Sequence, residues 1–146
     1  MSENLNKLFT PVRVVEEISA DKVLDVYDTG KVFMLTSSGA LAITLPAAGA
    51  DDITGCCFTF ICRTGPVAAM MGGGDYQIKN TADKIIGTVQ SSTGGDASDD
   101  LDGDHINFVG GTAIEGDRIE IFCDGTNYYA FGFCNADGGI TITEDD

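Results

Sequence analysis

The residue of this chain best suited to acid–base chemistry is its single histidine, His105. It lies in the stretch GDHINFVGG, at the expected start of a β-strand, directly after Asp104. A catalytic histidine needs an orienting acid and a nucleophile that the fold brings to it from other parts of the chain. No motif in the sequence supplies these partners. We therefore expect a structural histidine near a turn, no catalytic residues and no enzymatic activity.

An acidic segment, residues 91–104 (SSTGGDASDDLDGD), contains the densest group of carboxylates. Oxygen ligands at alternate positions, as at Ser98, Asp100 and Asp102, partly resemble the start of a calcium-binding EF-hand loop. The pattern departs at two positions, because Ser98 stands where the first acid belongs and Val109 stands where the closing glutamate belongs. The segment has almost no apolar side chains to bury, so we expect a solvated loop, with calcium binding as the weaker alternative.

Soft metal ligands are present but are not grouped. The five cysteines have no C-x-x-C spacing, and the histidine is distant in sequence, whereas zinc ligands cluster at short spacings. Three cysteines belong to the apolar stretch GCCFTFICR, so we expect reduced thiols in the core and no metal. The glycines at 72–74 lack the lysine and the helix of a phosphate loop. The sequence thus predicts no cofactor. The cysteines are Cys56, Cys57, Cys62, Cys123 and Cys134.

The elements that must position these residues are short strands. Runs rich in β-branched and aromatic residues recur about every ten residues, separated by Gly, Asp, Asn and Ser. This spacing predicts an all-β fold, either an antiparallel β-sandwich or a jelly-roll-like barrel. At 146 residues we expect an N-terminal arm (1–20) and a single β domain (21–146). The expected strands are KVLDVYD, KVFMLTSS, ALAITLPA, CCFTFICR, DYQIKN, KIIGTVQ, HINFVGG, DRIEIFCD, NYYAFGFC and GITIT.

Two segments outside these runs carry apolar residues with no obvious place in a core. In the arm, Val12 and Val14 alternate with polar residues, so the arm could extend a sheet edge in its own subunit or in a neighbouring one. In TGPVAAMMGGGD, Met70 and Met71 precede three glycines. Such a flexible tip either adapts to the surface of a neighbour or tucks its methionines back into the core. All four residues are candidate interface residues.

The C-terminal hairpin, residues 117–134 (DRIEIFCDGTNYYAFGFC), is apolar on both faces. An Asp-Gly turn places Ile119, Ile121 and Tyr128 on one face, and pleat alternation places an aromatic set on the other. Each aromatic side chain buries about 150–250 Å², so this set, left in water, makes a patch near the upper limit for a monomer. A loop, the arm or another subunit must cover it, and we favour subunits related by cyclic symmetry, in three copies. The set is Phe122, Tyr129, Phe131 and Phe133.

The formal net charge of −15, from 23 acidic and 8 basic residues, excludes two classes of partner. Nucleic acids and anionic membranes are bound through Lys and Arg, so neither is expected here. No stretch reaches the roughly 18 apolar residues of a membrane span, and the N-terminus lacks the layout of a secretory signal. We therefore expect a protein made in a cytoplasm, whose partners present neutral or basic surfaces.

Most of the chain after the arm, residues 30–143, resembles small β-rich virion proteins of tailed bacteriophages. The acidic segment at 91–104 is not part of the shared pattern. The matching motifs are a glycine followed by an aromatic-Leu strand (30–35), an Ile-Thr-Leu-Pro-Ala strand (43–47), a Gly-x-x-Phe-x-Phe strand (55–60), an Ile-x-Gly element (85–87) and an Asp-Gly-Thr-Asn-aromatic-Tyr hairpin (124–129).

This resemblance implies a β-rich homotrimer that acts by binding, without catalysis. Fibre proteins usually add a long repetitive or coiled shaft, and the sequence contains none. We therefore expect a capsid decoration (cement) protein that is made in the host cytoplasm and binds the major capsid protein on the virion surface. Many modest contacts summed over the lattice would stabilise the head shell. The alternative is a tail-fibre or glycan-binding module, with Tyr76, Tyr128 or Tyr129 as sugar platforms.

Overall fold

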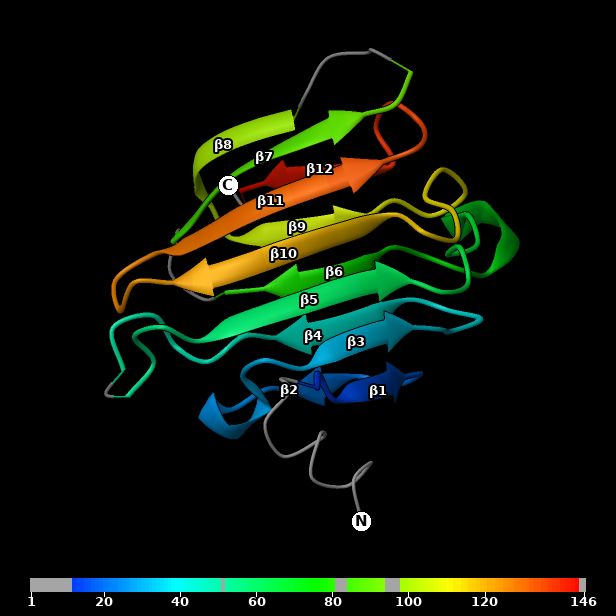
Figure 1. The fold of residues 1–146 in the computed structure, drawn as a ribbon. Helices are drawn as coiled ribbons and strands as arrows, with labels where there is room; N and C mark the ends of the chain where they lie inside the picture. The colour runs from blue at the N-terminus through cyan, green and yellow to red at the C-terminus, as the bar shows by residue number, and fades with distance from the viewer. Residues whose placement is uncertain (1–11, 51, 81–83, 94–97, 145–146) are drawn as a thin grey trace.

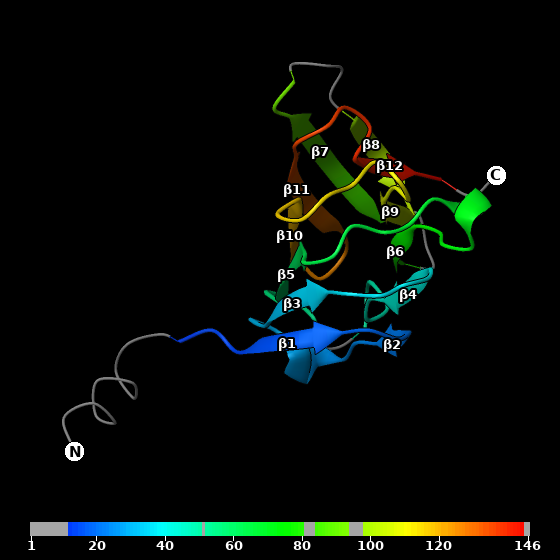
Figure 2. The same ribbon diagram turned by 90° about the vertical axis from the view of Figure 1, so that its right-hand side faces the viewer.

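The computed structural model describes residues 12–50, 52–80, 84–93 and 98–144, and its fold is all-β (Figure 1). The strands form a seven-stranded sheet, in the order β1-β3-β5-β10-β11-β7-β8, and a five-stranded sheet, in the order β12-β9-β6-β4-β2. The two sheets lie as two layers around one apolar core, as in a sandwich (Figure 2). The predicted all-β class is confirmed. The strands are β1 (Val15–Ile18), β2 (Lys22–Val23), β3 (Val32–Leu35), β4 (Leu41–Thr44), β5 (Cys57–Cys62), β6 (Tyr76–Lys79), β7 (Ile85–Ser91), β8 (Ser98–Gly103), β9 (His105–Phe108), β10 (Arg118–Cys123), β11 (Tyr128–Cys134) and β12 (Ile140–Thr143).

The sheets are mixed, so the prediction of an antiparallel sandwich is wrong in this respect. From β1 to β6 the chain crosses to the other sheet after every strand, and each strand therefore pairs in parallel with the strand two before it. Parallel pairs need such crossovers, whereas a hairpin turn would have produced antiparallel neighbours. The first half of the molecule is thus three turns of a flattened parallel coil. The antiparallel hairpin β10–β11 lies beside the last turn of this coil.

Two local predictions are also wrong. The stretch KVLDVYD is a strand only at Lys22–Val23, because Asp25 caps the 3-10 turn η1 (Val26–Asp28) by accepting a hydrogen bond from the backbone N–H of Tyr27 (2.8 Å). The expected loop at 91–104 includes strand β8, which pairs with β7 at the edge of the larger sheet. Charged residues are common on edge strands, where they discourage pairing with a further strand.

The core is built from the inward residues of both sheets. Leu41, Ile43 and Leu45 face it, as predicted for the ALAITLP strand. The five cysteines are all free thiols, and only Cys57 is not buried. Burial, with smaller contributions from two nearby carboxylates, raises the pKa of the Cys62 thiol to about 12. The predicted role of the cysteines as small buried hydrophobic residues therefore holds for four of the five.

An ion-pair network closes the end of the coil where β1 and β2 form the sheet edges. Glu16 on β1 accepts hydrogen bonds from the ammonium groups of Lys22 and Lys31. Lys31 also pairs with Asp28, with 2.6 Å between Nζ and Oδ1. The ammonium of Lys22 lies 5.5 Å from the centroid of the ring of Phe33, a buried core residue on β3. Paired charges thus cover a core that would otherwise end in water.

We predict that this network makes stability depend on pH. Hydrogen bonds from Lys22 and Lys31 lower the pKa of the Glu16 carboxyl below its usual value. A lowered pKa stabilises the fold above the unfolded-state value, about 4.3, and this contribution is lost as the pH falls through the lower folded-state value. Glu16→Gln should reduce the free energy of unfolding by about 1 kcal/mol at pH 7 and by less at pH 3.

Urea unfolding of both proteins at the two pH values measures this difference. Glu17→Gln is the matched control, because Glu17 forms an exposed pair with Arg63 and is expected to change stability little at either pH. A Glu16→Gln loss of equal size at pH 7 and pH 3 would contradict the prediction.

Candidate interaction surface

The outer face of the seven-stranded sheet is the side turned away from the core. Backbone pairing in the β10–β11 hairpin follows the predicted register, so the predicted assignment of its residues to two apolar faces is confirmed. The turn is set by Asp124, whose Oδ1 accepts hydrogen bonds from the backbone N–H groups of Thr126 and Asn127, each at 2.8 Å. Facing the core are Ile119, Ile121, Cys123, Tyr128 and Ala130, and facing outward are Arg118, Glu120, Phe122, Tyr129, Phe131 and Phe133.

Three phenylalanines of this outer face are in contact with water. Phe122 is 48% exposed, Phe131 68% and Phe133 47%, whereas the core residues Phe33 and Phe60 are fully buried. Within the described residues, no loop and no part of the arm covers these three side chains. We call Phe122, Tyr129, Phe131 and Phe133 together the aromatic face.

The hairpin turn also holds the fourth aromatic residue. The hydroxyl of Tyr129 lies 3.2 Å from Oδ2 of Asp124 and donates a hydrogen bond to it. Hydrogen bonds from the backbone of Asn127 and Thr126 lower the pKa of the Asp124 carboxyl, so it stays ionised and keeps accepting. The turn therefore fixes the position of Tyr129 at one end of the face.

An open groove of about 410 Å³ crosses the aromatic face over β5, β10 and β11. Phe122, Tyr129 and Phe131 line it from the hairpin, and Cys57 and Thr59 line it from β5. We call it the aromatic groove. Its lining combines aromatic rings with a few polar groups, which is the usual character of a site that binds an apolar group.

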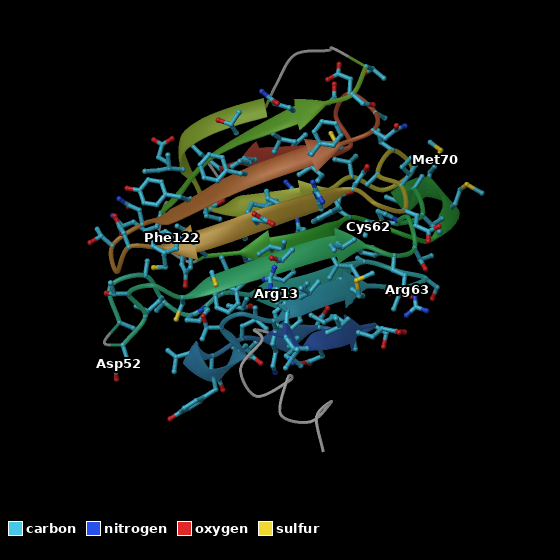
Figure 3. All side chains as sticks on the ribbon, viewed as in Figure 1. Arg13, Asp52, Cys62, Arg63, Met70 and Phe122 are labelled. Atoms are coloured by element: carbon cyan, nitrogen blue, oxygen red, sulfur yellow. The ribbon has the colours of Figure 1, made fainter. Side chains whose placement is uncertain are left out.

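Arg13 reaches the groove from the segment before β1 (Figure 3). Its Nε donates to the carbonyl oxygen of Gly30 (3.1 Å), and its second terminal nitrogen donates to Oγ1 of Thr59 (2.7 Å). Both acceptors are uncharged, and the carboxylate that lines the same groove belongs to Glu120, the cross-strand neighbour of Thr59. Sequence reasoning singled out the neighbouring valines and missed Arg13. The signal that could have identified Arg13 was the alternation of side chains along this segment, because it places Arg13 on the side opposite Val12 and Val14.

The two valines do not join the aromatic face. Val12 and Val14 are exposed and line a second, smaller groove of about 310 Å³ beside Lys31. Further along the same segment, Val15–Ile18 form strand β1 at the edge of the larger sheet of their own chain, parallel to β3. Residues 1–11 of the predicted arm lie outside the described residues.

The methionine pair forms a second apolar surface. Met70 is 94% exposed and Met71 77%, so neither packs back into the core. They belong to the 3-10 turn η2 (Ala69–Met71), and Val67, two residues before this turn, is also exposed. We call Val67, Met70 and Met71 the methionine knob.

The backbone around the knob is held by hydrogen bonds, in contrast to the flexible tip that we expected. The N–H of Gly111 donates to the carbonyl of Pro66 (2.7 Å), and the N–H of Gly74 donates to the carbonyl of Val67 (2.8 Å). A β-carbon at Gly73 would lie 2.1 Å from the Val67 carbonyl oxygen, so this position requires glycine. The glycines therefore serve close backbone packing, and the knob is preorganised.

The residues considered for chemistry lie elsewhere. His105 is buried at the start of β9, with Nδ1 2.5 Å from Oδ1 of Asp104, and its cross-strand neighbours are Lys79 and Thr143. The segment that resembles a calcium loop is the extended strand β8, which cannot wrap around an ion as an EF-hand loop does. Among the residues that the structure describes, no group of three or more His, Cys, Asp or Glu side chains is placed to hold a metal ion.

Two of the three candidate sugar platforms lie in the core. Tyr76 and Tyr128 are fully buried, and their hydroxyls donate to the carbonyls of Ser37 (2.8 Å) and Pro46 (2.7 Å). Burial raises the pKa of both phenols. Of the three tyrosines, only Tyr129 can contact a ligand.

In the described parts of the chain, no helix is long and apolar enough to cross a membrane.

Taken together, the site residues predicted from sequence fall into three places: the aromatic face, the methionine knob and the valines near β1. Comparison with protein-family models, with curated proteins and with solved structures gives no match to this chain.

Proposed function

We propose that this protein is a non-enzymatic capsid decoration (cement) protein of a tailed bacteriophage. The single observation that carries the proposal is the aromatic face, on which three phenylalanines are exposed to solvent. Exposed aromatic clusters of this kind mark surfaces that bind other proteins, because their burial supplies the central contacts of an interface. The resemblance of the sequence motifs to those of phage virion proteins gives this surface its proposed context.

The charges on the outer face support binding to protein. Arg13 and Arg118 lie on this face with Glu120, so it is close to neutral although the whole chain carries −15. A neutral patch can approach another protein without the repulsion that the rest of the surface would cause. The rest of the protein surface is acidic, which favours solubility of the protein and disfavours DNA and anionic lipid as partners.

In this proposal the protein is a homotrimer on the outer surface of the capsid, with the major capsid protein as its partner. Each trimer offers three copies of every contact, so that individually weak contacts add up across the lattice. The role requires no cofactor and no catalytic residue. The alternative of a glycan-binding tail module is less well supported, because Tyr76 and Tyr128 are inside the core.

The test is binding to empty shells of the major capsid protein from the phage that encodes this chain, assembled without it. We expect the protein to sediment with these shells in saturable amounts and to raise the temperature at which they disassemble. Phe133→Lys should reduce binding at least tenfold, because loss of an aromatic hot-spot residue of an interface costs about 2 kcal/mol or more.

Val23→Lys is the control, since Val23 is exposed on β2 in the other sheet. Failure of the wild-type protein to sediment with shells would refute the capsid role. Equal loss of binding in both variants would refute the assignment of the aromatic face to this role.

A further inference from the structure

We propose that Cys56 and Cys123 are the site of an intramolecular disulfide bond, which forms under oxidising conditions and ties the loop before β5 to the C-terminal hairpin. The structure holds both residues as free thiols. Asp52 and Phe122, which lie close to them in sequence, are at the same end of the molecule (Figure 3). Neither cysteine belongs to the aromatic face or to the methionine knob, so the bond is independent of the proposed function.

The two cysteines lie directly opposite each other on neighbouring antiparallel segments. Cys57, at the start of β5, pairs with Phe122 on β10. The next pair in this register is Cys56 with Cys123, and the backbone N–H of Cys123 donates to the carbonyl oxygen of Cys56 (2.8 Å). The Cα atoms of an opposite, hydrogen-bonded pair are about 5.5 Å apart, within the range of about 4.4–6.8 Å that disulfides span. The backbone spacing of this pair therefore fits a disulfide.

Both side chains point into the core. Cys56 is 5% exposed and Cys123 is fully buried. The adjacent pair, Cys57 and Phe122, faces outward. Tyr128, the neighbour of Cys123 on β11, is also fully buried, so three inward side chains form one row across neighbouring segments. The two thiols thus share one face of the strand pair, as a disulfide requires.

A β-bulge fixes the position of Cys56. Gly55 has a φ of 86°, and its N–H donates to the carbonyl oxygen of Cys123 (2.8 Å), so Gly55 and Cys56 together oppose this one residue. The N–H of Cys56 donates to the carbonyl oxygen of Ile53 (3.0 Å), which closes the turn before the bulge. Both backbone polar groups of Cys56 are therefore bonded, and little further ordering is needed to bring the two thiols together.

The positions of the other cysteines do not allow a second bond of this kind. Cys62 on β5 and Cys134 on β11 are separated by β10. Two strand spacings are about 9.5 Å, and cysteines with Cα atoms more than about 7 Å apart cannot be bridged without backbone movement. Within the described residues, which include all five cysteines, Cys56 and Cys123 are the one pair that lies directly across two segments on the same face.

Burial protects these thiols in the folded protein. It raises the pKa of the Cys123 thiol, and the nearby Asp124 and Cys56 raise the pKa further. The reactive form of a cysteine is the thiolate, so a raised pKa slows oxidation. We therefore expect the bond to form while this end of the molecule is open, as during folding, and then to be enclosed by the core.

The oxidant is a small disulfide such as oxidised glutathione. One thiolate attacks it, forms a mixed disulfide and releases one reduced glutathione, and the second thiolate then attacks the protein sulfur of this intermediate and releases the other. The two cysteines lose two electrons and two protons, which reduce the glutathione disulfide. Nearly half of the chain lies between Cys56 and Cys123, so the bond restricts a long loop of the unfolded chain and stabilises the fold.

The test is refolding of the reduced protein from urea in buffers that contain either oxidised or reduced glutathione, followed by acid quenching and mass spectrometry. In the oxidising buffer the protein should lose the mass of two hydrogen atoms, and peptide mapping should place the bond between Cys56 and Cys123. The midpoint of thermal unfolding should rise by about 5–15 °C over that of the reduced protein. Dithiothreitol should reverse this rise.

Cys57→Ser is the matched control, because it removes the adjacent thiol and should leave the bond and the rise in midpoint unchanged. It also removes any glutathione adduct on the exposed Cys57, which would add mass. Cys123→Ala, verified as folded by circular dichroism, should form no internal bond and should give the same midpoint in both buffers. The mapping on the wild-type protein does not depend on this variant. A wild-type protein without an internal bond, a bond mapped to another pair, or an oxidised protein no more stable than the reduced one would each overturn the proposal.

Discussion

Replacing Phe60 by alanine should lower the free energy of unfolding by about 3–5 kcal/mol. Phe60 on β5 is fully buried between the sheets, and its ring stacks on that of Phe33, with the centroids 5.3 Å apart. Truncation removes the transfer free energy of the ring and leaves a cavity that the two sheets cannot fill without moving. The ring lies in the coil, where neighbouring turns share one core, so the loss is expected to affect the whole domain.

Urea unfolding of wild type and variant measures this loss, and Phe131→Ala on β11 is the matched control. Phe131 is 68% exposed on the outer face, so its truncation should change monomer stability by no more than about 0.5 kcal/mol. The comparison is made at a protein concentration where self-association is absent. Similar losses for both variants would mean that inner and outer faces are wrongly assigned.

The outward position of Phe131 was predictable from sequence in the hairpin. The Asp-Gly turn fixes the register, and the pleat then assigns each residue from Arg118 to Phe133 to a face. Both steps depend on residues close together in the chain. For the same reason, the inward residues of ALAITLP could be named correctly.

The direction of strand pairing was not predictable in this way. Alternating burial has the same period in parallel and antiparallel sheets, so the strands β1 to β6 look alike in either arrangement. Their order depends on where each connection leads, and those connections show no pattern of residues that requires a crossover. The edge strand β8 was missed because it is held by backbone pairing with β7, whereas its acidic side chains suggested a loop.

The candidate site was predictable only in part. Hydrophobic alternation identified the aromatic face, but the contribution of Arg13 depends on contacts with Gly30 and Thr59, far away in sequence. The rigidity of the knob likewise depends on hydrogen bonds between two loops. Contacts of this kind follow from the whole fold and leave no short-range signal.

Gly87, the glycine of the Ile-x-Gly element, lies at a position where the fold admits no larger residue. A β-carbon there would lie 2.6 Å from Cδ1 of Ile142, 2.8 Å from the carbonyl oxygen of Ala130 and 2.9 Å from the Ala130 side chain. The isoleucine tip could rotate away, but the carbonyl belongs to strand β11, which pairs with β7 at this point. The glycine therefore allows β12 to pack closely over the junction of β7 and β11.

We expect Gly87→Val to destabilise the protein by about 1–3 kcal/mol, the usual cost of forcing extra atoms into a packed core, and Gly87→Ala by less. Thermal and urea unfolding measure both changes. Combining Gly87→Ala with Ile142→Val, which removes Cδ1, should recover part of the loss but not all of it, because the Ala130 carbonyl remains in place. The coupling between the two sites follows from the double-mutant cycle.

Gly132→Ala on the neighbouring strand β11 is the matched control for Gly87→Ala. Its added β-carbon would contact only side-chain ends, at 3.0 Å from Val89 and 3.3 Å from Ile119, and these can move. Alanine in a strand also gains about 0.5–1 kcal/mol over glycine from backbone entropy, so this variant should be close to neutral. Gly87→Ala should therefore be clearly the less stable of the two. Equal stability of Gly87→Ala and Gly132→Ala would contradict this prediction. It would mean that the close packing of β12 over β7 and β11 does not require glycine in the Ile-x-Gly element.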